Sequence, residues 1–208
     1  MNIASSTPSV LDLFGALTTV DEETRDRLHA RLVAAADREG LLDIAYRTVD
    51  SPLGSLLVAT TEAGLVRVAF AAQDHAAVLA DLAAQVSPRV LRAPGRLDEA
   101  ARELNDYFEG RRSVFDLPLD LRLARGFRRD VLRHLCDIRY GATESYSTVA
   151  AATGHPNAAR AVGSACRVNP LPIVIPCHRV VRADGTPGDY AGGVEAKRRL
   201  LALESSAA

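Results

Sequence analysis

The chain has 208 residues, of which 48% are hydrophobic and 25% charged, and its formal net charge is −1. This composition is typical of globular proteins with a sizeable buried core, and no apolar run reaches the roughly 18 residues of a membrane span. Residues 1–14 hold no basic residue and carry Asp12, unlike a secretory signal. Three cysteines without close pairs argue against a disulfide framework or a zinc ribbon, so we expect a cytoplasmic protein without a metal.

The charge is unevenly distributed along the chain. Residues 121–200 carry 13 basic and 6 acidic residues, whereas the rest of the chain carries 12 basic and 20 acidic ones. A basic second half could attract a polyanion, but it could equally be a solvated face.

The sequence of residues 1–41 predicts a single helix. Residues 1–20 are expected to be poorly structured, apart from a short apolar piece at 10–17. Asp21 is suited to cap a helix that runs to Glu39, with acidic residues in its first turn and Gly40 at its end. We therefore expect residues 1–41 to form an extension.

The next segment, 42–121, is expected to be a small α+β domain. Its apolar residues change to the period of strands, and turn signals separate three of these strands, which favours an antiparallel meander. The predicted strands are 42–50, 55–60, 65–71 and 113–119, and the predicted helices are 74–85 and 97–109.

After a connection at 121–126, the remainder to residue 208 is expected to be mainly helical. Helices are predicted at 127–139, 146–153, 157–167 and 194–203. The second and third are separated by Gly154-His155-Pro156, which is typical of a helix-turn-helix. From spacing alone, DNA binding and simple packing are about equally favoured.

Cys177 is the first candidate for chemistry. A lone cysteine is usually a buried, inert thiol. Here it follows Pro176 at a predicted turn, and the basic residues just after it would favour a thiolate. Cys136 and Cys166 lie within helical patterns and are interpreted as core residues.

His178, next to Cys177, could act as a base. Adjacent side chains on a strand point to opposite faces, so the pair needs a turn or a bridging water. A base also needs an orienting carboxylate. The candidates in the sequence are Asp184, Asp189, Glu195 and Glu204, and the pattern does not choose among them.

The segment Ile175-Pro176-Cys177-His178-Arg179-Val180 resembles the active-site signature of the O6-alkylguanine-DNA alkyltransferases. Further segments of the chain stand in family order with family-like spacing. They are Ser145-Tyr146, Ala158 to Gly163, Arg167 with Asn169-Pro170, Tyr190 to Gly193, and Leu200 to Glu204. The resemblance covers about residues 43–205 and implies a ribonuclease H-like first domain before the helix-turn-helix.

The resemblance implies a suicide repair protein that needs no cofactor. The alkyl group of O6-alkylguanine, and by extension O4-alkylthymine, would pass irreversibly to Cys177. His178 would activate the sulfur through a water, with Glu204 orienting the imidazole. Tyr146 would help the guanine to leave, and Asn169 would brace the turn.

The resemblance also implies a partner, double-stranded DNA contacted in its minor groove, and residues that contact it. Arg160 would enter the base stack in place of the extruded nucleotide. The implied DNA-contacting set is Arg160, Ala159, Arg167 and Ser145. The implied base pocket consists of Tyr190, Val180, Ala191 and Gly192. We expect a monomer with no membrane contact, and cooperative assembly on DNA stays open.

Two alternative functions compete with this interpretation. A non-catalytic relative that only binds alkylated bases would lack the acceptor cysteine, which is present here. A cysteine hydrolase with a Cys-His-Glu triad would turn over repeatedly and would leave the helix-turn-helix without a purpose. One departure concerns substrate preference, because Ala191 stands where many relatives have serine in the turn that contacts the guanine oxygen.

Overall fold

The computed structural model describes residues 21–205, and the predicted apolar piece at 10–17 lies outside them. The chain up to Leu41 and the chain from Leu42 form two separate compact units. The first unit contains α2 (Glu22–Arg38), which Asp21 caps as predicted by accepting a hydrogen bond from the Thr24 amide. Within residues 21–205, none of the helices combines the length and apolar character that crossing a bilayer requires.

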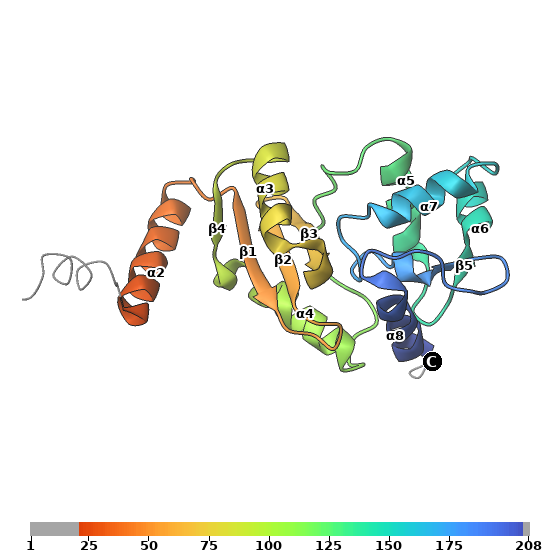
Figure 1. The fold of residues 1–208 in the computed structure, drawn as a ribbon. Coiled ribbons are helices and arrows are strands. Elements are labelled where there is room, and N and C mark those ends of the chain that lie inside the picture. Colours follow the sequence, from red (N-terminus) through yellow and green to blue (C-terminus); the bar gives the residue numbers. More distant parts are fainter. Residues whose placement is uncertain (1–20, 206–208) are drawn as a thin grey trace, which may run out of the picture. The chain divides into compact units, whose positions relative to one another are not determined.

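The second unit begins with a four-stranded mixed sheet that carries helices (Figure 1). Its strands are β1 (Ile44–Val49), β2 (Leu56–Thr61), β3 (Gly64–Phe70) and β4 (Val90–Arg92). They lie in the order β3-β2-β1-β4, and the predicted antiparallel meander is confirmed for β1, β2 and β3. The fourth strand was not predicted and pairs parallel to β1, with Ile44 opposite Val90.

The core of the sheet forms against α3 (His75–Gln85). Apolar side chains from both elements are buried there: Ile44, Leu57, Ala59, Val66, Ala69, Val78 and Leu82. The chain continues through a 3-10 turn, η2 (Pro94–Leu97), into α4 (Asp98–Phe108), which buries Leu104 and Tyr107. Tyr107 has no exposed surface, so this helix places an aromatic side chain inside the unit.

The predicted strand 113–119 is wrong, because this segment is irregular. It meets β3 only at a single bridge between Leu65 and Leu119, where the Leu65 amide donates to the Pro118 carbonyl at 2.7 Å. Pro118 has no N–H to donate to a ladder. The approach is close, since a side chain at Gly64 would lie 2.2 Å from the Pro118 oxygen.

The rest of the unit is mainly helical, as predicted. It contains α5 (Phe127–Asp137), α6 (Tyr146–Ala152), α7 (Ala159–Arg167), the 3-10 turn η3 (Cys177–Arg179) and α8 (Gly193–Ser205). Two short strands, β5 (Glu144–Ser145) and β6 (Val180–Val181), pair in parallel. This pairing fixes the start of α6 beside the turn that carries Cys177.

Candidate active site and DNA-facing surface

The turn that leads to Cys177 is held by one side chain. The Asn169 amide donates to the Ile175 carbonyl at 2.9 Å and to the Cys177 sulfur at 3.2 Å, and its oxygen accepts from the Leu171 amide at 2.9 Å. Ile173 has φ = 75°, a left-handed conformation that β-branched residues rarely adopt. Asn169 therefore ties together a strained turn whose end is the candidate nucleophile.

Cys177 is a protonated thiol in the resting protein. The side chain is 1% exposed, and this burial raises its pKa to about 11, although the Asn169 hydrogen bond and the charge of Lys197 act in the opposite direction. The expectation that neighbouring basic residues favour a thiolate is therefore wrong for this state. Arg179 pairs with Glu204 instead, and desolvation of the sulfur outweighs the remaining positive charge.

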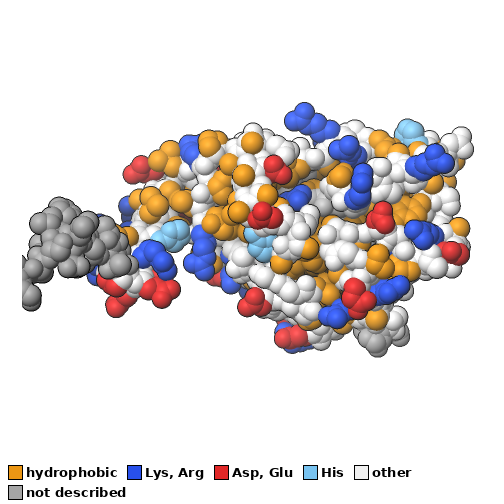
Figure 2. Space-filling view, in the orientation of Figure 1, with side chains coloured by type: hydrophobic (Ala, Val, Ile, Leu, Met, Phe, Trp, Pro, Cys, Tyr) orange, Lys and Arg blue, Asp and Glu red, His pale blue; other side chains and the backbone are white. Residues whose placement is uncertain are grey.

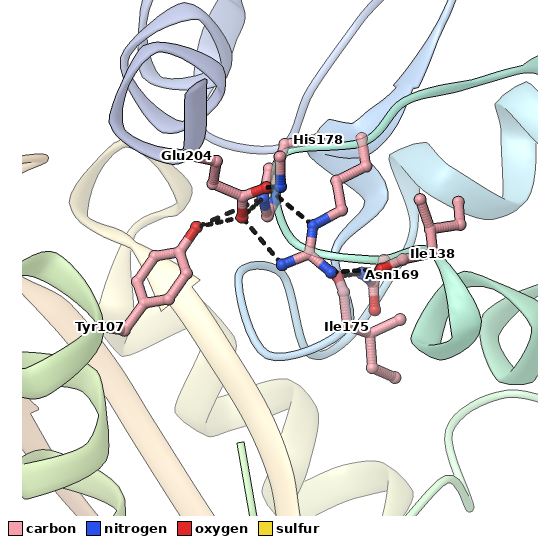
Figure 3. Close-up of polar contacts among 8 residues, drawn as sticks. Tyr107, Ile138, Asn169, Ile175, His178 and Glu204 are labelled. Carbon is pink, nitrogen blue, oxygen red and sulfur yellow. Dashed lines mark hydrogen bonds and ion pairs between the residues drawn. The ribbon is translucent and has the colours of Figure 1, made fainter. Parts of the chain in front are cut away.

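His178 is a neutral imidazole oriented by Glu204 (Figure 3). Its Nε2 lies 2.9 Å from Glu204 Oε1, and burial lowers the pKa of His178. Burial acts to raise the pKa of Glu204, but hydrogen bonds from His178 and Arg179 hold it at about 2, so the carboxylate can only accept. Nε2 therefore carries the proton, and Nδ1, buried without a partner, keeps its lone pair.

Glu204 is the carboxylate that the family resemblance implies and that the residue pattern alone leaves open among four acids. It accepts hydrogen bonds from several donors. Arg179 binds it with two nitrogens, each at 2.9 Å, while the third donates to the Ile138 carbonyl at 2.5 Å. The Gly141 amide donates to Oε2 at 3.1 Å, and the Tyr107 hydroxyl to Oε1 at 2.7 Å. The roles of Arg179 and Tyr107 were not predicted from the sequence. Arg179 lies within the signature segment, whereas no pattern pointed to Tyr107.

Tyr146 is placed next to the Cys177 turn by the β5–β6 pair. It is the first residue of α6, and the Ser145 hydroxyl caps this helix by accepting from the Thr148 amide at 3.0 Å. Burial, together with the nearby thiols of Cys166 and Cys177, raises the pKa of Tyr146 to about 12. The phenol is therefore protonated at neutral pH and can donate a proton.

Lys197 is buried between these groups. It has no exposed surface, and its ammonium donates to the Val180 carbonyl at 2.5 Å and lies 5.8 Å from the centre of the Tyr146 ring. Burial lowers the pKa of Lys197, and the two thiols of Cys177 and Cys166 oppose that shift. The only lysine of the chain thus supplies positive charge beside the candidate nucleophile.

The predicted base-pocket aromatic, Tyr190, is buried between two rings. Its centroid lies 5.6 Å from Phe70 and 6.2 Å from His178, both in edge-on arrangements. The following Ala191 and Gly192 are half-buried. A side chain at Gly192 would lie 2.8 Å from the Phe70 ring, so the sheet presses directly against this loop.

A groove of about 440 Å³ opens beside the helix-turn-helix. It gathers four of the predicted residues, Tyr146, Ala159, Arg160 and Arg167, together with Arg182, which was not among the predicted DNA-contacting residues. Figure 2 shows basic side chains over the surface that α5, α6 and α7 form. The full lining consists of Tyr146, Ala159, Arg160, Gly163, Ser164, Arg167, Arg182, Gly188 and Asp189.

The other two cysteines differ from each other. Cys166 is buried in α7, as predicted, and burial raises its pKa. Cys136 is exposed, so its interpretation as a core residue is wrong. The reason is the register of α5, which turns Val131, Leu132 and Leu135 toward the core. Within residues 21–205, no three His, Cys, Asp or Glu side chains are arranged to hold a metal ion.

Two family models match the second unit. Residues 44–121 match the ribonuclease-like domain of 6-O-methylguanine DNA methyltransferase, and residues 126–206 match its DNA-binding domain. The chain belongs to the 6-O-methylguanine DNA methyltransferase family. The two domain names agree with the predicted fold class, a small α+β part followed by a helical part.

Similar members of this methyltransferase family cover most of the second unit. The methylated-DNA–protein-cysteine methyltransferase of Mycobacterium tuberculosis is 40% identical over 165 residues, which are 79% of this chain and 94% of that protein. The human protein of the same name is 39% identical and covers 76% of this chain and 78% of its own. A crystal structure of the M. tuberculosis O6-methylguanine methyltransferase has a TM-score of 0.70 at 39% identity, with 79% of this chain and 94% of that one covered. The same M. tuberculosis protein has been solved in complex with DNA.

Proposed function

We propose that the protein repairs alkylated DNA directly by transferring the alkyl group of O6-alkylguanine to its own Cys177. The observation that carries this proposal is that a buried thiol, Cys177, directly precedes a buried His178 whose Nδ1 has no partner. Glu204 fixes the tautomer of His178, since its Oε1 lies 2.9 Å from Nε2, and the Asn169 amide donates to the Cys177 sulfur at 3.2 Å. Family membership supports the same activity.

The proposed reaction is a displacement at the alkyl carbon. The Cys177 thiol gives its proton through a water to His178 Nδ1, and the sulfur then forms a bond to the carbon while the bond from that carbon to guanine O6 breaks. A thiolate is well suited to this attack. The Asn169 donor and the charge of Lys197 stabilise the thiolate as it forms, which offsets part of the desolvation cost.

The departing guanine must gain the proton that the thiol lost. Tyr146 is suited to donate it toward a ring nitrogen, because its hydroxyl lies in the groove beside the turn and its raised pKa, about 12, keeps the phenol protonated until the guanine leaves. The imidazolium of His178 then restores the phenol through solvent. The products are guanine and a thioether, which has no activated carbonyl and does not hydrolyse. Each molecule therefore reacts once.

The DNA partner is proposed to be a duplex contacted through its minor groove by α7. The lesion is inaccessible within a duplex, so the nucleotide must be extruded, and in this proposal Arg160 fills the gap. Ala159, Arg167 and Ser145 remain proposed contacts.

The decisive experiment mixes the protein with duplex DNA that carries O6-methylguanine labelled in the methyl group. We expect one equivalent of label on Cys177, mapped by mass, and none in Cys177→Ala. Binding of the lesion without transfer would support the non-catalytic alternative. Label released in excess of protein would indicate a hydrolase.

A further inference from the structure

A residue far from the signature reaches the catalytic carboxylate. Tyr107 belongs to α4, in the part of the chain that matches the ribonuclease-like domain. Its hydroxyl donates to Glu204 Oε1 at 2.7 Å and lies 3.4 Å from His178 Nε2 (Figure 3). The side chain has no exposed surface. The hydroxyl thus meets both members of the His–Glu pair from a helix that carries no other part of the proposed site.

The geometry assigns the proton positions around this hydroxyl. A phenol has one proton, and the ionised Glu204 can only accept, so that proton lies on the 2.7 Å contact. The phenol oxygen therefore faces the Nε2–H of His178 with its lone pairs. The Nε2–H group of His178 has a strong acceptor, Glu204 Oε1 at 2.9 Å, and a weaker one, the Tyr107 oxygen at 3.4 Å. Both contacts hold the proton on Nε2 and leave Nδ1 free.

We propose that Tyr107 is a positioning residue for the transfer reaction, which holds Glu204 and the tautomer of His178 so that Nδ1 can take the thiol proton. The proposal rests on the proposed function, because it assigns a role within that site. It also gives the ribonuclease-like part a direct share in the chemistry, in addition to its packing against the helical part.

Loss of this hydroxyl should change the basicity of His178 in a definite direction. A hydrogen bond to a carboxylate disperses its charge, so removing the Tyr107 donor makes Glu204 a stronger acceptor from His178. The imidazolium then gains stability and the pKa of His178 rises. The ionisable groups around His178 are Tyr107 from α4, Cys177 and Arg179 from η3, Tyr190 from the loop before α8, and Lys197 and Glu204 from α8.

The matched control is Tyr140. Its ring contacts the Tyr107 ring edge-on at 6.0 Å, and its hydroxyl is buried without a hydrogen-bond partner. Tyr107→Phe and Tyr140→Phe therefore remove the same atom from neighbouring rings, but only the first removes donation to Glu204. A loss caused by altered packing alone would affect both variants.

The experiment measures the single-turnover rate of methyl transfer to Cys177 from duplex DNA between pH 5 and 9, together with melting temperatures. We expect Tyr107→Phe to be about tenfold slower at neutral pH, because Glu204 and the imidazole of His178 are no longer held in place for the proton transfer. The acid limb of its pH–rate profile should move to higher pH, since His178 with a raised pKa stays protonated, and cannot act as a base, up to a higher pH. Tyr140→Phe should keep the wild-type rate and profile.

A second measurement keeps the inference separate from the proposed function. The imidazole nitrogen resonances of His178 in the DNA-free protein should show Nδ1 unprotonated, and the pKa of His178 should rise in Tyr107→Phe. If the wild type takes no methyl group, the proposed function fails while this titration still reports on Tyr107. If the wild type reacts and Tyr107→Phe matches it in rate, pH profile and titration, the positioning role is overturned. Equal slowing of both variants would overturn it as well.

Discussion

The side-chain amide of Asn169 donates a hydrogen bond to the sulfur of Cys177 at 3.2 Å. The same nitrogen donates to the Ile175 carbonyl, so one group both closes the turn and faces the nucleophile. Folding and reactivity are therefore coupled at this position.

Substitution of Asn169 should affect both properties. Asn169→Ala leaves the Leu171 amide unpaired in the interior and removes one of the two donors to the Ile175 carbonyl, which keeps the Cys177 amide. We expect a loss of about 1–3 kcal/mol of stability together with slower transfer. Asn169→Asp keeps the acceptor for Leu171 but places a carboxyl group against the sulfur, so it should react more slowly still. Denaturant unfolding and single-turnover rates check this, and an unchanged rate in the Asp variant would exclude the role of the donor.

The reactivity of Cys177 in the DNA-free protein should rise with pH. Its pKa is raised to about 11 by burial, so only about one thiol in ten thousand is ionised at pH 7. Labelling with iodoacetamide, mapped by mass, should accelerate about tenfold per pH unit up to pH 9 or 10. Unfolding in urea should restore the behaviour of an ordinary thiol. A plateau in the folded protein near pH 8 would show that burial does not control this sulfur.

Arg160 should matter for duplex DNA and little for a free substrate. We expect Arg160→Ala to slow transfer from O6-methylguanine in a duplex at least tenfold, because the vacated position in the base stack is no longer filled. The rate with free O6-methylguanine should change less than twofold. The control is Arg102→Ala, which removes an equal charge from a side chain on α4 that is 65% exposed and lies outside the groove. Equal losses in both variants would point to a general electrostatic effect.

The contact between Gly192 and Phe70 should limit the shape of the base pocket. Gly192→Ala places a carbon 2.8 Å from the Phe70 ring. We expect it to cost about 1–3 kcal/mol of stability by overpacking and to slow transfer. The double variant Gly192→Ala with Phe70→Leu should regain part of both losses. Gly95→Ala is the control, since nothing lies within 4 Å of that added carbon. Absence of any recovery in the double variant would locate the effect elsewhere.

Most helices and strands were predicted from local patterns, because the spacing of apolar residues and the turn residues between elements can be seen within a short stretch of sequence. The segment 113–119 was wrongly predicted to be a strand, because Pro118 has no N–H group and prevents a continuous ladder of hydrogen bonds. The three residues of β4 were too few to show a period, and their pairing with β1 depends on contacts across more than 40 positions.

The site was predictable where its residues lie within one motif. Cys177 and His178 could be located from their neighbours, but the reasoning from the residues could not choose Glu204 among four acids until the fold brought it to 2.9 Å from the imidazole. The protonation of Cys177 was predicted wrongly, because the sequence shows nearby charges and does not show burial. Tyr107 was missed because its hydroxyl reaches the site from 97 residues away.

The parallel pair between residues 144–145 and 180–181 has a consequence for protein engineering. It couples the start of α6 to the turn that carries the sulfur, so the proposed DNA-contacting surface and the sulfur are joined by one pair of strands. A chimera that exchanges only the helical pair, or only the reactive turn, would break this pair of strands. The smallest segment worth transplanting between relatives therefore includes both strands of the pair.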